Sequence, residues 1–105
     1  MKEITVSELK RKKDEGEDFQ LIDVREPHEY EQANLGGELI PLATVRDQAE
    51  RISRQKPVII HCRSGMRSAT AVQLLEKEFG FDNLYNLKGG ILAYAREIDP
   101  TLQVS

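Results

Sequence analysis

The sequence predicts an α/β fold built on a central, mostly parallel sheet with helices on both faces. Short apolar segments that suit strands alternate along the chain with segments that suit helices. Residues 58–60 are apolar at three successive positions, which is typical of a parallel strand covered on both faces. The 105 residues contain no repeat, low-complexity tract or linker, so we expect one domain over residues 1–105.

The first predicted elements are a helix, a strand and a second, short helix. Thr5 and Glu8 fit a capping box that opens a helix ending at about Glu15. The compact apolar run at 19–24 predicts a strand. Pro27 suits the first position of the short helix that follows, because its fixed backbone angle is compatible with a helix start.

Further along, two glycines at 36–37 end the short helix. Apolar periodicity and turn residues then delimit the rest of the chain. The remaining elements are expected in this order: a strand over 38–40, a polar helix over 43–53, a strand over 58–61, a helix ended by Gly80, a strand over 84–87 and a helix over 91–98.

Composition excludes several classes of protein. Hydrophobic residues make up 39% of the chain and charged residues 31%, which fits a globular domain and argues against disorder. The net charge of −3 gives no reason to expect a nucleic-acid or membrane surface. No apolar run approaches the roughly 18 residues of a membrane span, and the N-terminus has no signal-peptide pattern. We therefore expect a cytoplasmic protein.

The only cysteine of the chain, Cys62, directly follows the strand predicted over 58–61. In parallel sheets the active crevice lies beyond the carboxyl ends of the strands, which is where this thiol falls. A free thiol has a pKa near 8.5, and helix N-termini and neighbouring cations can lower it to about 3.5–7.5. Both devices are expected here, so the pattern favours a reactive thiolate. The candidate site consists of Cys62 and the loop Arg63, Ser64, Gly65, Met66, Arg67 and Ser68.

Each type of residue in this loop has a physical reason to be there. Arg63 and Arg67 supply positive charge, and Gly65 lets the backbone curl closely around the sulfur. Ser64 and Ser68 offer hydroxyl donors, and successive N–H groups can form an anion nest. The alternative is a buried structural cysteine beside ordinary surface arginines, but such a thiol needs neither two arginines nor a glycine turn.

The loop at 62–68 resembles the active-site loop of the rhodanese-like sulfurtransferases. Segment 21–30 is similar to the family's Asp-Val-Arg signature, and segment 36–42 to its Gly-Ala-x-x-Ile-Pro segment. Segment 87–94 resembles the terminal Gly-Gly-x-x-x-Trp motif. The four matches occur in the family's order and cover nearly the whole chain.

Two positions depart from the family's pattern: Gly37 stands where alanine is usual, and Tyr94 where tryptophan is usual. The spacing of Cys62 and Arg67 is Cys-x4-Arg, as in the sulfurtransferase form. Related phosphatases carry a loop that is one residue longer and holds a phosphate or arsenate. The resemblance therefore implies a cradle for a single sulfur atom.

The implied activity is covalent sulfur transfer through a persulfide on Cys62, with no cofactor and no metal. The donor would be thiosulfate or a persulfide, and the acceptor cyanide, a thiol or a protein. Two alternatives remain: a non-catalytic sulfur-binding or regulatory module, and a phosphatase or arsenate reductase of related fold. The ending at 95–100 resembles rhodanese domains joined to adenylating enzymes. This suggests the hypothesis that the partner is a ubiquitin-like sulfur-carrier protein or its adenylating enzyme.

Four residues outside the loop have more limited expected roles. Asp23 and Arg25 end a strand at the same edge of the sheet as Cys62, and we expect a structural ion pair that braces the loop. His61 is expected to be packed and His28 exposed to solvent. The spacing of these histidines and Cys62 does not match a metal site.

Overall fold

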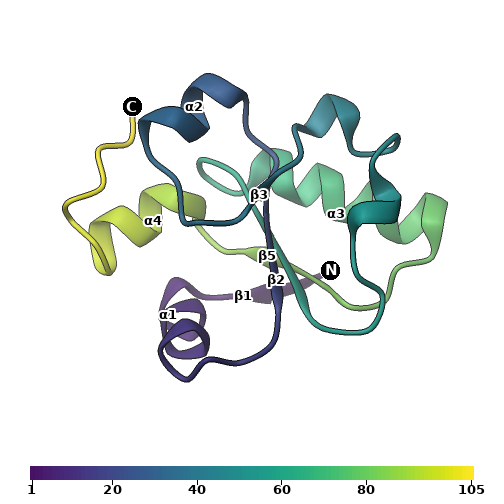
Figure 1. The fold of residues 1–105 in the computed structure, drawn as a ribbon, viewed down its shortest axis with the longest axis horizontal. Helices are drawn as coiled ribbons and strands as arrows, with labels where there is room; N and C mark the ends of the chain where they lie inside the picture. Colours follow the sequence, from purple (N-terminus) through teal and green to yellow (C-terminus); the bar gives the residue numbers. More distant parts are fainter.

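The computed structural model describes residues 1–105 and contains one sheet of five parallel strands in the order β1-β5-β4-β2-β3 (Figure 1). The predicted α/β class is confirmed. The register aligns Asp23 of β2 with His61 of β4, so these strands end together at one edge of the sheet. The strands are β1 (Lys2–Ile4), β2 (Gln20–Asp23), β3 (Glu38–Leu39), β4 (Val58–His61) and β5 (Leu84–Leu87).

Helices cover both faces of this sheet, as predicted. The α-helices are α1 (Val6–Asp14), α2 (Pro27–Gln32), α3 (Met66–Phe79) and α4 (Gly90–Glu97). Helices α1 and α4 contact each other and share one apolar cluster, while α3 packs in a second cluster on the other face. None of the helices has both the length and the apolar character that a membrane crossing requires.

Strand β4 separates the two clusters and is buried throughout. Val58 and Ile60 belong to the cluster with α3, whereas Ile59 belongs to the cluster with α1 and α4. Successive side chains of a strand point to opposite faces, so a strand with apolar residues at consecutive positions must be covered twice. The apolar run in the sequence therefore places Cys62 at the end of the central, most protected strand.

The helix boundaries are explained by local chemistry. Thr5 and Glu8 form the predicted capping box, in which the Glu8 N–H donates to the Thr5 hydroxyl and the Thr5 N–H to the Glu8 carboxylate. Gly80 has a φ of 72° and ends α3, as predicted.

The prediction of a polar helix over 43–53 is wrong. This segment contains two short 3-10 helices, Leu42–Thr44 and Ala49–Arg51, separated by a turn. The Thr44 hydroxyl donates to the carbonyl of Pro41 and accepts from the amide of Gln48. Side chains that bond locally in this way compete with the regular backbone ladder of a helix.

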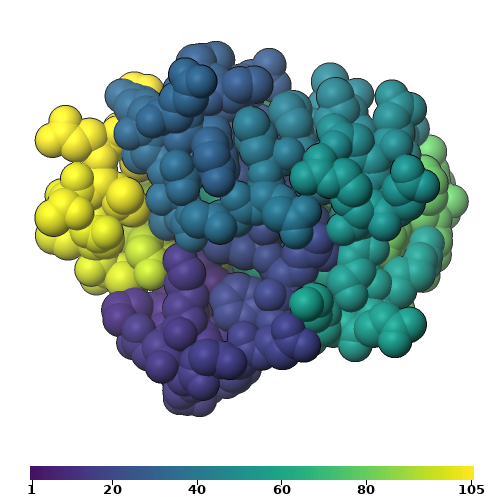
Figure 2. Space-filling view, in the orientation of Figure 1, coloured from purple at the N-terminus to yellow at the C-terminus, as the bar shows by residue number.

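The C-terminal segment returns to the side of the molecule that carries α2 (Figures 1 and 2). The Ser105 hydroxyl donates to the side-chain oxygen of Gln32 over 2.8 Å. Leu102 and Val104 pack against the cluster that α1 and α4 share. The last residues are thereby drawn toward the edge of the sheet where β4 ends.

Candidate active site

The sulfur of Cys62 is the point on which several hydrogen-bond donors converge. The backbone N–H of Gly65 donates to Sγ over 3.1 Å, and that of Ser68 over 3.4 Å. The Ser68 hydroxyl oxygen lies 3.3 Å from Sγ. Cys62 is only 1% exposed, so these donors replace the water that would otherwise solvate a thiolate.

The backbone conformation of Gly65 makes this convergence possible. Its φ of 113° lies in the region that residues with a Cβ rarely adopt, and it precedes the first residue of α3. The Asn86 side chain, on β5, donates to the carbonyl of Gly65 over 3.2 Å. The same carbonyl also accepts the N–H of Ala69 over 3.1 Å, so it is engaged by two donors other than the thiol.

The electrostatic result is a thiol that ionises more readily than an ordinary one. Burial of Cys62 raises its pKa. Hydrogen bonds from the Ser68 side chain and from the backbone N–H groups of Ser68, Gly65 and Ser64 lower it, and together they outweigh the effect of burial. The net pKa of Cys62 is therefore below its usual value. The loop therefore favours the thiolate form of Cys62.

Helix α4 holds the same loop from its other side. The N–H of Ile91 donates to the carbonyl of Cys62 over 3.0 Å, and the N–H of Leu92 to that of Arg63 over 3.1 Å. A Cβ on Gly90 would lie 2.6 Å from the Cys62 carbonyl oxygen and 2.5 Å from that of Arg63. The glycine is needed because the start of α4 approaches the loop backbone this closely.

Neither loop arginine hydrogen-bonds to the sulfur, although the sequence predicts positive charge from both beside the thiol. The Arg63 side chain is exposed and donates to the carbonyl of Ser105 over 2.6 Å. Arg67 makes two parallel hydrogen bonds to the Glu29 carboxylate of α2, over 2.7 and 2.9 Å. Hydrogen bonds, rather than a direct arginine contact, thus form the immediate surroundings of Sγ.

Glu29 is ionised in this pair at any ordinary pH. The hydrogen bonds from Arg67 lower the pKa of Glu29 to about 2, with a smaller contribution from the Glu26 N–H. That N–H donates to the same carboxylate over 3.0 Å. The pKa of Arg67 is raised, first by Glu29 and also by the nearby charge of Cys62.

Asp23 and Arg25 form the predicted ion pair, at 2.8 Å, and both are almost fully buried. The Arg25 guanidinium also donates to the carbonyl of Ala33, which ties β2 to the end of α2. His61 is completely buried, and burial lowers its pKa, so it is neutral. His28 is exposed, as expected.

The remaining loop side chains point outward. Met66 is 80% exposed and Ser64 is also exposed. Neither side chain takes part in the bonds around Sγ. The candidate residues therefore divide by their side chains. The Ser68 hydroxyl lies at the sulfur, whereas the side chains of the remaining loop residues with side chains, Arg63, Ser64, Met66 and Arg67, lie at the rim.

A sequence model of the rhodanese-like domain matches residues 5–97 of this chain. The chain belongs to the rhodanese-like domain family. A protein named sulfurtransferase from Allochromatium vinosum is 35% identical over 95 residues, which cover 90% of this chain and 88% of that protein. The crystal structure of a rhodanese-like domain protein from Staphylococcus aureus superposes with a TM-score of 0.84 at 34% identity, covering 100% of this chain and 99% of that one.

Other relatives of this rhodanese-like domain are longer. The uncharacterized protein YqhL of Bacillus subtilis is 42% identical over 80 residues, which cover 75% of this chain and 63% of YqhL. The probable adenylyltransferase/sulfurtransferase MoeZ of Mycobacterium tuberculosis is 32% identical over 102 residues, covering 94% of this chain and 26% of MoeZ. The chain thus spans less than two thirds of the length of these relatives.

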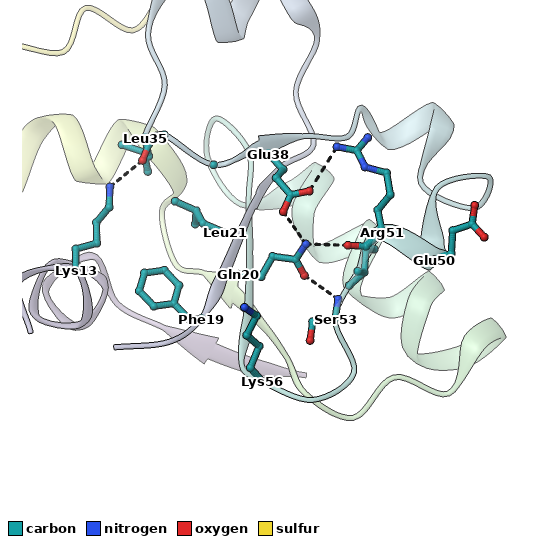
Figure 3. Close-up of a pocket in the computed structure, with 13 residues that line it drawn as sticks. Lys13, Phe19, Gln20, Leu21, Leu35, Glu38, Glu50, Arg51, Ser53 and Lys56 are labelled. Carbon is teal, nitrogen blue, oxygen red and sulfur yellow. Dashed lines mark hydrogen bonds and ion pairs between the residues drawn. The ribbon is translucent and has the colours of Figure 1, made fainter. Parts of the chain in front are cut away.

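The rhodanese-like domain also has a hollow of about 540 Å³ away from the thiol (Figure 3). It lies beside the first residues of β2 and β3, at the end of the strands opposite to Cys62. The Gln20 side-chain amide lines this hollow. It donates to the Glu38 carboxylate and to the carbonyl of Arg51, and it accepts from the N–H of Ser53. These bonds join β2, β3 and the segment before β4, so the polar groups of this hollow serve the fold.

Two residues beside the thiol loop were not identified from the sequence. Asn86 and Glu29 are 21 and 38 residues from the loop residues that they bind. Asn86 lies in the β5 segment and Glu29 in the segment that resembles the family's Asp-Val-Arg signature, but neither pattern indicates a contact with the loop. Only the parallel arrangement of β5, β4 and β2 brings them to one edge.

Ser68→Ala tests the contribution of the hydroxyl to the thiolate. We expect alkylation of Cys62 by iodoacetamide at neutral pH to slow by about three- to tenfold, because a hydrogen bond to a charged group is lost. The rate is measured as a function of pH, and its midpoint should move upward. Ser64→Ala, which keeps the backbone N–H and removes an exposed hydroxyl, is the matched control. Equal pH profiles for the two variants would contradict the assigned role of the Ser68 hydroxyl.

Proposed function

We propose that this rhodanese-like domain transfers sulfane sulfur through a persulfide on Cys62. The convergence of N–H groups and the Ser68 hydroxyl on Sγ is the observation that carries the proposal. A cradle of donors stabilises the thiolate that attacks, and the same donors suit the negative charge of a terminal persulfide sulfur. Residues 62–68 would form the site, with Asp23 and Arg25 as structural support.

In the first step the Cys62 thiolate attacks the outer sulfur of a donor such as thiosulfate. A sulfur–sulfur bond forms to Cys62, and the bond between the two donor sulfurs breaks. The electron pair of the broken bond leaves with sulfite, and the negative charge of the thiolate moves to the terminal sulfur of the new persulfide. No proton or oxidant is consumed.

In the second step a nucleophilic acceptor attacks the terminal sulfur and the Cys62 thiolate leaves. Cyanide would give thiocyanate, and an ionised thiol would give a new persulfide. The chain has no second cysteine, so an intramolecular disulfide cannot discharge the persulfide. The acceptor must therefore come from outside residues 1–105.

We propose that the physiological acceptor is a protein. The relatives of this chain include a protein named as a putative sulfur carrier, YrkF of Bacillus subtilis, at 36% identity, and MoeZ, named as an adenylyltransferase/sulfurtransferase. These names support a relay to a ubiquitin-like sulfur carrier or its adenylating enzyme. A reducing compartment such as the cytoplasm would keep the single thiol free for this task.

Intact-mass measurement after incubation with thiosulfate tests the proposal. The wild-type chain should gain the mass of one sulfur atom, cyanide should remove it, and Cys62→Ser should gain nothing. No gain with thiosulfate or with any small persulfide would overturn sulfur transfer and favour a non-catalytic module. Turnover of a phosphoester in place of sulfur uptake would favour the phosphatase alternative, against which the Cys-x4-Arg spacing argues.

A further inference from the structure

The ion pair between Glu29 and Arg67 is placed where it can control the charge at the thiol loop. Arg67 belongs to the loop and to the first turn of α3, whereas Glu29 comes from α2. The two hydrogen bonds are short and parallel, the geometry in which an arginine and a carboxylate bind most specifically. The Glu29 side chain is only 17% exposed and that of Arg67 35%.

The Glu29 carboxylate is held in place independently of Arg67. It accepts the N–H of Glu26 as part of the capping box of α2, so its position is fixed by the helix start. Its pKa of about 2 keeps it ionised under all working conditions. A fixed carboxylate therefore faces the guanidinium permanently.

The pair also explains why Arg67 does not act as a free cation at the thiol loop. A guanidinium beside the sulfur would attract anionic donors in proportion to their charge. Paired with Glu29, Arg67 contributes almost no net charge. Arg63 is exposed and directed at the carbonyl of Ser105, so it does not replace this lost charge at the sulfur.

We propose that Glu29 is a positioning residue and counterion that neutralises Arg67, so that the Cys62 site does not favour dianionic donors over monoanionic ones. This specificity rests on the proposed sulfur transfer, but the electrostatic role of Glu29 does not. Monoanionic donors include alkyl persulfides and thiosulfonates, and thiosulfate is the dianion. Glu29 thereby tunes the site toward organic sulfane sulfur.

The first test measures the electrostatic potential at Cys62 by alkylation, without any sulfur transfer. Iodoacetate and iodoacetamide alkylate the same thiolate but differ by one negative charge. In Glu29→Gln the unpaired Arg67 should raise the ratio of the iodoacetate rate to the iodoacetamide rate about threefold at low salt, measured where Cys62 is fully ionised. Glu31→Gln changes the net charge equally on an exposed position of α2 and should leave the ratio unchanged.

The second test compares two donors of like chemistry, thiosulfate and methanethiosulfonate, which release sulfite and methanesulfinate. In Glu29→Gln we expect kcat/KM to rise about tenfold for the dianion and about threefold for the monoanion, because Coulomb energy scales with charge. Arg67→Gln leaves the Glu29 carboxylate unpaired. It should therefore lower both the ratio of the iodoacetate rate to the iodoacetamide rate and the ratio of kcat/KM for thiosulfate to that for methanethiosulfonate. It keeps the test decisive if Glu29→Gln folds poorly.

The outcomes separate this proposal from the proposed function. An alkylation ratio that is the same in wild type, Glu29→Gln and Arg67→Gln overturns the counterion role. Equal losses of kcat/KM for both donors in Glu29→Gln overturn the donor specificity and assign Glu29 a structural role. If the alkylation ratio changes as expected but the wild type accepts sulfur from neither donor, the proposed function fails while the counterion role stands.

Discussion

Replacing Arg25 by alanine is expected to lower the free energy of unfolding by about 3–5 kcal/mol, because the change leaves a buried carboxylate without its partner. Asp23 is completely buried, and Arg25 donates to both of its carboxylate oxygens. The carbonyl of Ala33 would lose its donor as well. Urea unfolding monitored by circular dichroism measures the change, and the midpoint should fall with little change in slope.

The exposed pair of Arg46 and Glu78 provides the matched control for Arg25. It has the same two-bond geometry on the surface, where the side chains are 60% and 42% exposed. Arg46→Ala should therefore cost less than about 1 kcal/mol. A loss for Arg25→Ala as small as that for Arg46→Ala would show that the buried pair is not a major support of the fold.

Gly90→Ala is expected to damage stability and thiol reactivity together. The added Cβ would overlap the carbonyl oxygens of Cys62 and Arg63, and the residue has a φ of 61°. Either the loop or the start of α4 must move, at a cost of about 3 kcal/mol or more. Movement of the loop would misalign the N–H groups of Gly65 and Ser68, so alkylation of Cys62 at neutral pH should also slow.

Gly80→Ala separates the steric effect of Gly90→Ala from backbone strain. Gly80 has a similar φ of 72°, but no atom lies within 4 Å of an added Cβ there. This variant should lose only about 1–2 kcal/mol, the cost of the left-handed conformation. It should alkylate at the wild-type rate. If both glycine variants have the same stability and the same alkylation rate, the close approach of α4 to the loop has no energetic role.

Much of the fold could be predicted because its signals are local. A buried parallel strand requires consecutive apolar residues, and 58–60 provide them. Capping boxes and C-terminal glycines act within a few residues, so Thr5 predicts the start of α1 and Gly80 the end of α3. The same holds for the position of Cys62 at a strand end, and for the ion pair between Asp23 and Arg25, two residues apart.

The errors occur where distant or competing contacts decide the structure. Strand β1 was not predicted, because only Ile4 of its three residues is buried and its pairing with β5 joins segments about 80 residues apart. In 43–53 the buried residues Val45, Ala49 and Ile52 have helical spacing. Local bonds made by the Thr44 side chain nevertheless break the segment into two turns. The arginine partners could not be predicted, since Glu29 is 38 residues from Arg67.

The attachment of the thiol loop to α4 and β5 has a consequence for its chemistry. The carbonyl oxygens of Cys62, Arg63 and Gly65 are each bonded to a donor outside the loop. Their negative ends are therefore engaged elsewhere, and the dipoles that remain near the sulfur are oriented with their positive ends inward. In the proposed persulfide, the charge on the terminal sulfur would meet N–H groups that already face it, so no peptide group would have to rotate. In water, solvent molecules would have to reorient around this new charge, whereas here folding has already oriented the donors.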